Sequence, residues 1–245
     1  SFNSTIPWYF GTDGKAPAHQ YDFVSTVLHE IAHGLGFTGF LEANTSNLTA
    51  SYGYNDALPA VFDRFIENFN GKRLTDQTVF TNPSNELYKS LVSNQLYSGS
   101  PVAYAWGFEN RPRLFAPYTF KEGSSIYHLN DQSYPYGTNN ALMTPSAGKG
   151  EVIHSPGPLT SGILADLGWK HLYFTFIPLK DREETGIPLE FETRIESDAG
   201  IEEGSVYLVY STDGFIAQSD SIPLLPQGKP GNYRALLDPG PEPMK

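Results

Sequence analysis

The clearest periodic pattern in the chain lies just after its first twenty residues. Apolar side chains recur there at the three- and four-residue spacing that places them on one face of an α-helix. Asp22 stands before the first of them as a candidate N-cap, and Gly34 and Gly36 predict the end of the helix. The apolar positions are Phe23, Val24, Val27, Leu28, Ile31, Ala32 and Leu35.

Shorter elements are predicted along the next 150 residues. Residues 6–10 suit an edge strand, and residues 61–69 suit a helix or a buried strand. A short helix is expected over residues 86–92. Two strands are expected within residues 101–120, around a polar turn at residues 109–112. The last predictions in this part are a loop from residue 128 and a short helix that Thr160 caps and Gly168 ends.

From about residue 171 alternation dominates the pattern. It is clearest over residues 189–195 and partial over residues 172–177 and 205–210; turn signals separate the three runs, which is typical of half-buried strands. The remaining length holds about five strands, fewer than the roughly seven of a complete immunoglobulin-type sandwich. The pattern therefore predicts an α+β chain with one domain over residues 1–170 and a small, incomplete β-sandwich over residues 171–245.

Charge and composition exclude several classes of partner and site. The chain carries 27 acidic and 16 basic residues, a net charge of -11, which disfavours binding to nucleic acid or to anionic lipid. It has no cysteine, so disulfides and cysteine-based zinc sites are excluded. No apolar run reaches the 18 or so residues of a membrane span. Oligomeric state is left open.

The predicted helix contains the segment His29-Glu30-Ile31-Ala32-His33. Two histidines four residues apart lie on one helical face, one turn apart, where both can bind one Zn²⁺. Glu30 can act as the general base that takes a proton from the attacking water. The same five-residue pattern also occurs by chance, and histidines on a helix can simply be hydrogen-bonded core groups.

A catalytic zinc needs three protein ligands and one open position. The compact metzincin signature places a glycine three residues after the second histidine and a third histidine six residues after it. Gly36 occupies the glycine position, but the histidine position is Gly39. The third ligand must therefore come from elsewhere, and the other histidines are His19, His128, His154 and His171.

The segment LHEIAHGLGF, residues 28–37, resembles the active-site helix of the leishmanolysin-like metzincins. In that family the third histidine follows a long insertion and precedes a Met-turn; the matching segments here are GSSIYH, ending at His128, and ALMTP, which contains Met143. The resemblance, over roughly residues 20–170, implies a secreted or cell-surface zinc endopeptidase, with His128 as the third ligand and Met143 as the floor beneath the metal. The family has a substantial β-sheet before this helix, whereas only about 22 residues precede it here. Either the N-terminal part of the domain is missing, or the sheet is assembled differently.

Other residues remain candidates at this site. His154, eleven residues after Met143, is an alternative third ligand or a donor to the oxyanion, and Glu67 would give a thermolysin-like ligand set. Asn55-Asp56 and Asn130-Asp131 could bind Ca²⁺, although such pairs are more often turn formers.

Two functional hypotheses follow. In the first, the chain is a zinc endopeptidase whose peptide or protein substrate lies extended along residues 6–10. In the second, it is a non-catalytic, zinc-containing extracellular module, a degenerate zinc domain with a β-sandwich, that binds protein or glycan. Residues 171–245 resemble the immunoglobulin-like domains appended to secreted bacterial enzymes, and the short segment before the helix favours this second hypothesis. An intact Glu30 favours the first, since a structural zinc site needs no base.

Overall fold

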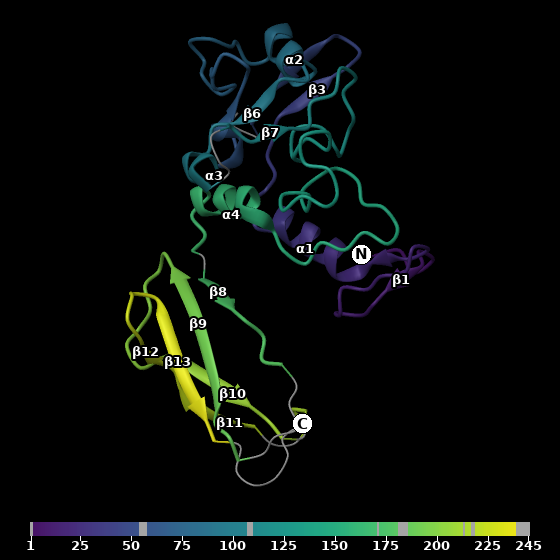
Figure 1. The fold of residues 1–245 in the computed structure, drawn as a ribbon. Coiled ribbons are helices and arrows are strands. Elements are labelled where there is room, and N and C mark those ends of the chain that lie inside the picture. The colour runs from purple at the N-terminus through teal and green to yellow at the C-terminus, as the bar shows by residue number, and fades with distance from the viewer. Residues whose placement is uncertain are drawn as a thin grey trace. The chain divides into compact units, whose positions relative to one another are not determined.

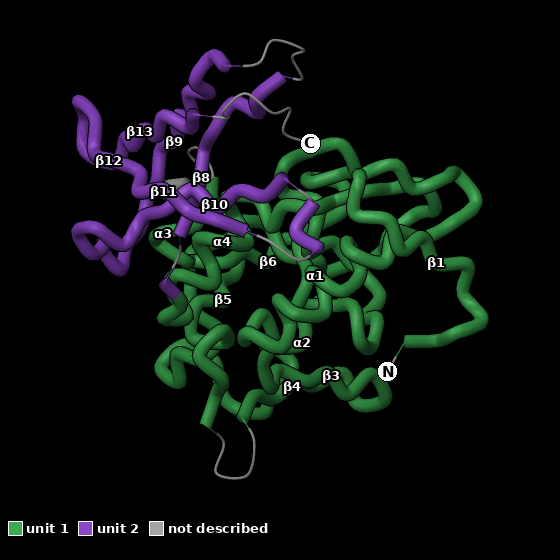
Figure 2. The backbone as a smooth tube through the Cα atoms, turned by 90° about the horizontal axis from the view of Figure 1, so that it is seen from below, with its two compact units in different colours: residues 1–169 green, residues 170–245 purple. Residues whose placement is uncertain are grey.

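The computed structural model describes residues 2–53, 58–106, 110–170, 172–180, 186–212, 214–216 and 219–238. The chain divides into two compact units, Ser1–Trp169 and Lys170–Lys245 (Figure 2). The sequence-based boundary differs from this division by one residue. Both helices and antiparallel strands are present, so the chain is α+β.

The first unit combines short helices with several small sheets (Figure 1). Its strands form a parallel pair β1-β2, an antiparallel pair β3-β4 and an antiparallel sheet β5-β6-β7. The helices are α1 (Phe23–Gly34), α2 (Asn85–Leu91), α3 (Pro101–Trp106), α4 (Gly157–Asp166) and the 3₁₀ helix η1 (Phe62–Phe65). The strands are β1 (Trp8–Tyr9), β2 (Tyr21–Asp22), β3 (Glu42–Asn44), β4 (Thr49–Ser51), β5 (Ile66–Glu67), β6 (Leu96–Ser98) and β7 (Arg113–Leu114).

Helix α1 confirms the strongest sequence prediction. Asp22 is its N-cap, and the Asp22 carboxylate accepts a hydrogen bond from the Ser25 backbone N–H at 2.8 Å. Satisfying a free N–H of the first turn in this way is the usual role of an N-terminal Asp. The short helix predicted over residues 86–92 is also confirmed, as α2, where Ser84 accepts from the Leu87 N–H.

One continuous core joins the elements of the first unit. Side chains from η1, β5, β6, β7 and α2 meet the segments around residues 126–143 with almost no solvent exposure. The largest fully buried side chains are Phe37, Phe62, Ile66, Leu74, Leu87, Leu91, Leu96, Leu114, Ile126, Leu129, Met143 and Leu159. The core therefore surrounds the segments that carry the candidate site residues.

The prediction of two strands within residues 101–120 is wrong. Residues Pro101–Trp106 form helix α3, and only Arg113–Leu114 pair as a strand; Glu109 of the predicted turn lies outside the described residues. Ser100 accepts from the Ala103 N–H at 3.2 Å and Asp166 of α4 accepts from the Val102 N–H at 2.9 Å. These contacts satisfy free N–H groups in the first turn of α3, where proline is tolerated. They stabilise the helix more than the weak local alternation favours a strand.

Two other boundaries also differ from the predictions. Residues 61–69 divide into η1 and β5, so the segment is partly helix and partly strand. Helix α4 begins at Gly157, and Thr160 lies buried inside it rather than capping it. The Leu159 N–H donates instead to the Asn140 side chain at 3.0 Å, a partner that local sequence does not reveal.

Helices α3 and α4 pack closely at a glycine. A Cβ added at Gly162 would lie 2.5 Å from the Cα of Ala103, so the two backbones approach more closely than any side chain allows. We expect Gly162→Ala to lower the free energy of unfolding by about 1–3 kcal/mol, because the helices must separate. Urea denaturation measures this. Gly34→Ala is the control, because a Cβ there meets nothing within 4 Å; equal stability of the two variants would contradict the close approach.

The second unit holds an antiparallel sheet in the order β12-β13-β9-β8 and a separate antiparallel pair β10-β11. The three predicted strands are confirmed as β8, β9 and β10. Ile195, Ala235, Leu237 and Leu224 are buried between the strands, whereas every residue of β8 is exposed. The strands are β8 (Leu172–Phe176), β9 (Leu189–Ser197), β10 (Tyr207–Tyr210), β11 (Asp220–Pro223), β12 (Leu225–Pro226) and β13 (Asn232–Leu237).

Among the described residues, no helix has the length and apolar character needed to cross a lipid bilayer.

Candidate metal centre

Three histidines converge in the first unit. His29 and His33 lie one turn apart on α1, and His128 comes from the loop that follows β7. The Nε2 atoms of His29 and His33 are 3.1 Å apart, and each lies 3.3 Å from Nε2 of His128. Among the described residues, these three histidines are the group of potential metal ligands that lie close enough together to hold one ion.

The other ring nitrogen of each histidine points at a backbone carbonyl. Nδ1 of His29 lies 2.7 Å from the Leu142 oxygen, Nδ1 of His33 lies 2.8 Å from the Phe37 oxygen, and Nδ1 of His128 lies 2.8 Å from the Ser124 oxygen. A carbonyl can only accept, so the proton of each neutral imidazole resides on Nδ1. The three Nε2 atoms therefore direct lone pairs toward a common point and cannot hydrogen-bond to one another.

This arrangement fits a tetrahedral metal ion. Nitrogens bound at about 2.0–2.1 Å to a tetrahedral Zn²⁺ lie roughly 3.3–3.4 Å apart, close to the three observed separations. Burial, with a smaller contribution from the neighbouring imidazoles, lowers the pKa of His128 to about 4, and burial also lowers the pKa of His29. Both rings are then neutral at physiological pH, as metal binding requires.

The end of α1 orients His33. The Gly36 N–H bonds to the His33 carbonyl and the Phe37 N–H bonds to the Ala32 carbonyl, both at 3.0 Å, which is a Schellman motif. Gly36 has a φ of 108°, a conformation that favours glycine. The sharp turn predicted from this glycine is therefore present. It brings the Phe37 carbonyl back to Nδ1 of His33, so the sequence that ends the helix also orients a candidate ligand.

The loop before His128 is held by the buried residues beside it. Tyr127 donates to the Asp63 carboxylate at 2.8 Å and accepts from the Leu41 N–H at 2.6 Å. Burial raises the pKa of both Asp63 and Tyr127. Ile126 has a φ of 82°, which is strained for a β-branched residue. We infer that these contacts fix the backbone that presents the His128 ring.

Met143 and Leu142 connect the two parts of the site. The Met143 side chain is fully buried in the core, and its carbonyl accepts from the Leu129 N–H, next to His128, at 2.7 Å. The preceding carbonyl, that of Leu142, accepts from His29. The backbone of the segment predicted to form a Met-turn therefore contacts His29 on the helix and Leu129, the residue that follows His128.

Glu30 lies exposed on α1 between two cavities. A cavity of about 190 Å³ is lined by Glu30 and His29 together with residues of the 141–147 segment and Ile153. A wider cleft of about 720 Å³ is lined by Glu30, His33 and His128 together with residues from 38–45 and 120–127. Strand β3 supplies Glu42 and Ala43 to this cleft, whereas residues 6–10, where the extended substrate was expected, line neither of the two cavities.

The structure does not bring the other sequence candidates to the three histidines. Nε2 of His154 donates to Asp22 at 2.8 Å, at the opposite end of α1 from His33, and Glu67 pairs with Arg111 at 3.0 Å. The Asn130 side chain accepts from Ser133, as in a turn, which is its expected alternative to a calcium ligand. Asn55 and Asp56 lie outside the described residues.

Sequence reasoning missed the groups that orient the candidate ligands. Three are backbone carbonyls, which carry no residue-type signal. The Asp63–Tyr127 pair and the Asp22–His154 pair join residues 64 and 132 positions apart. Only the N-cap position of Asp22 could have been recognised as a polar site from sequence.

Comparisons with known proteins give one partial match. A family model described as SPBPB7E8-like matches residues 1–106, which include α1 with His29, Glu30 and His33 but not His128. No curated protein matches the chain, and no solved structure matches it.

Proposed function

We propose that the chain is a zinc-dependent endopeptidase in which His29, His33 and His128 bind the metal. The observation that carries this proposal is the convergence of three Nε2 atoms at 3.1–3.3 Å, each on a ring whose Nδ1 contacts a carbonyl. Three imidazoles leave one position of a four-coordinate metal free, as in catalytic rather than structural zinc sites. The resemblance of residues 28–37 to the metzincin helix supports the same assignment and a location outside the cell.

Zinc bound at this site would supply Lewis acidity and would favour ionisation of water near neutral pH. The carboxylate of Glu30 accepts the proton of the attacking water and passes it to the leaving amine. Its exposed position between the two cavities allows both transfers, because a peptide that crosses from one cavity to the other places its scissile bond beside Glu30. The backbone of the peptide runs extended past β3.

The test combines metal analysis with an activity assay on the chain of residues 1–245. We expect one zinc per chain by elemental analysis, cleavage of casein and of a peptide library, and loss of cleavage on chelation that added zinc restores. Anomalous scattering at the zinc edge should place the ion between the three Nε2 atoms. Stoichiometric zinc with no cleavage of any peptide would instead favour the non-catalytic binding module, and absence of zinc would reject both.

A further inference from the structure

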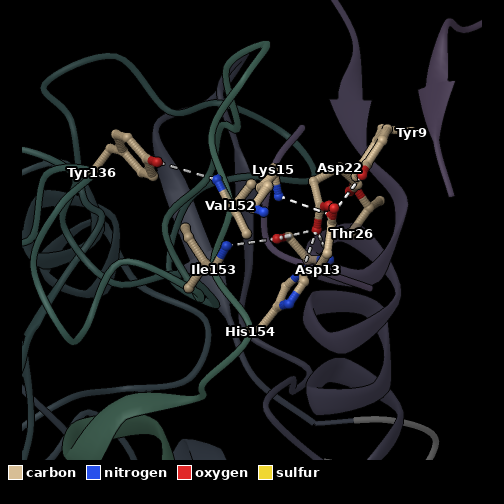
Figure 3. A network of polar contacts seen from close by, with 10 residues as sticks. Tyr9, Asp13, Lys15, Asp22, Thr26, Tyr136, Val152, Ile153 and His154 are labelled. Atoms are coloured by element: carbon tan, nitrogen blue, oxygen red, sulfur yellow. Dashed lines mark hydrogen bonds and ion pairs between the residues drawn. The ribbon is translucent and has the colours of Figure 1, made fainter. Parts of the chain in front are cut away.

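The residues around His154 form a hydrogen-bonded chain that the proposed catalytic chemistry does not use (Figure 3). The Ile153 N–H donates to Ser25 Oγ at 2.7 Å, and Ser25 Oγ–H donates to Asp22 Oδ2 at 2.6 Å. His154 Nε2 donates to the same Asp22 oxygen at 2.8 Å. Two consecutive residues of the 142–154 segment are thus hydrogen-bonded to the first turn of the helix that carries His29, Glu30 and His33.

The anchor of this chain is a buried charge. The Asp22 side chain is fully buried, whereas 27% of the His154 side chain is exposed. Burial opposes ionisation of Asp22, but the hydrogen bonds from Ser25 and His154 outweigh it and lower the pKa of the carboxyl. When a buried carboxylate loses a hydrogen-bond donor, much of the free-energy cost of its desolvation is no longer offset. The position of His154 is therefore strongly constrained.

The 142–154 segment also forms a wall of the smaller cavity. Ile153 and residues from 141–147 line it on the side of this segment, and Ser25, His29 and Glu30 line it from α1. At its other end the segment is tied to the candidate ligand His29, through the Leu142 carbonyl. The wall therefore runs from the carbonyl that orients His29 to the ring that pairs with Asp22, and both of its ends are attached to α1.

We propose that Asp22 and His154 are positioning residues that hold the 142–154 segment against α1 and so set the shape of the cavity beside Glu30. Neither residue touches the reacting atoms. The cavity has room for one side chain, and its lining is mostly apolar or hydroxylic, with Ala141, Leu142 and Ile153 among its residues. The pair thereby determines which substrate side chain fits next to the scissile bond. This consequence for substrates rests on the proposed peptidase function, whereas the fastening of the segment does not.

The first test measures the fastening without any assay of activity. Amide hydrogen exchange on the chain of residues 1–245 should show that His154→Ala speeds exchange at the Ile153 amide by about tenfold or more, because a hydrogen bond to a charged group is lost. His154→Gln keeps a side-chain N–H donor and should restore most of the protection. His19→Ala is the matched control, since His19 is exposed and takes part in none of these hydrogen bonds, even though it lies three residues before Asp22. Equal exchange at Ile153 in the wild type and in His154→Ala would overturn the proposal.

Two further contacts determine how far along the segment His154→Ala should speed amide exchange. The Gly150 N–H donates to the Gln20 carbonyl at 2.8 Å, and the Val152 N–H donates to the Tyr136 hydroxyl at 3.3 Å. Because these remain in His154→Ala, we expect faster exchange at Ile153 and little change at Gly150. A uniform rise throughout the first unit would mean general destabilisation and would count against a local positioning role.

The second test measures substrate choice. For two peptides with Ala or Trp next to the scissile bond, His154→Ala should change the ratio of their kcat/KM values by about tenfold, mainly through KM, while zinc content stays at one per chain. His154→Gln should return the ratio to that of the wild type. An unchanged ratio in an active variant with faster Ile153 exchange would overturn the role in specificity. A wild type that cleaves nothing would reject the peptidase function, and the exchange test would then still decide whether the pair holds the wall.

Discussion

Glu30→Gln is expected to leave zinc bound and to slow peptide hydrolysis by about 10²–10⁴-fold, the usual contribution of a general base. Glutamine has the size of glutamate but cannot accept a proton from water. Glu30 is exposed and is not one of the three grouped histidines, so neither folding nor metal binding should depend on its charge. The effect should appear in kcat, measured with a fluorogenic peptide at saturating concentration, with KM little changed.

The matched control for this variant is Glu86→Gln. Glu86 is also an exposed glutamate on a helix, in the first turn of α2, and it lines neither cavity. We expect wild-type turnover from it and equal zinc content in all three proteins. If Glu30→Gln cleaved the peptide within a few-fold of the wild-type rate, the assignment of the base would be wrong, and the observed hydrolysis would need another proton acceptor.

The parts of the molecule that local sequence predicts are those whose determinants are close together in the chain. Helix α1 has its N-cap, its apolar face and its terminating Gly36 within fifteen residues, so both of its ends were predicted. The spacing of His29 and His33 follows from that helix alone. Strands β8 and β9 were predicted for the same reason, because alternation is a local pattern.

The parts that local sequence could not predict depend on distant partners. Helix α3 forms where strands were expected because Asp166, more than sixty residues away, accepts from its first turn. The ring of His128 meets that of His33 across 95 positions, and no periodicity specifies that contact. Only the resemblance to metzincins indicated His128, and it gave no reason why the ring should point inward; the Ser124 carbonyl and the Asp63–Tyr127 pair supply that reason.

His154 is a residue that sequence suggested as a metal ligand and that the structure places elsewhere. From sequence it was an alternative third ligand, since a histidine just after a methionine-containing turn can approach a metal. Its Nε2 is instead bonded to Asp22, whose identity as an N-cap was predicted but whose second partner was not. Oδ2 of Asp22 accepts from His154 in addition to Ser25. A buried carboxylate gains from a further donor, but that donor comes from whichever segment packs there, and sequence does not specify that segment.

His128→Ala is expected to reduce zinc affinity by more than about 100-fold, because loss of a group that merely orients a ligand already costs about 10–100-fold. Two histidines on one helical turn remain, and they do not complete the three-ligand set of a catalytic site. Isothermal titration with zinc, with a competing chelator for the wild type, measures the difference. Elemental analysis of the purified variant should find most of the zinc absent, and hydrolysis should fall with it.

Thermal unfolding with and without zinc separates metal loss from damage to the core. His128 is only 6% exposed, so its truncation also leaves a small cavity and lowers stability in either condition. Zinc at 100 times its dissociation constant stabilises a folded protein by about 2.7 kcal/mol, and this increment should be present in the wild type and absent in His128→Ala. His19→Ala, which removes an exposed histidine, should keep the whole increment. A stoichiometric zinc content or an intact increment in His128→Ala would remove residue 128 from the ligand set, and the close approach of the three rings would then require an explanation other than a shared metal ion.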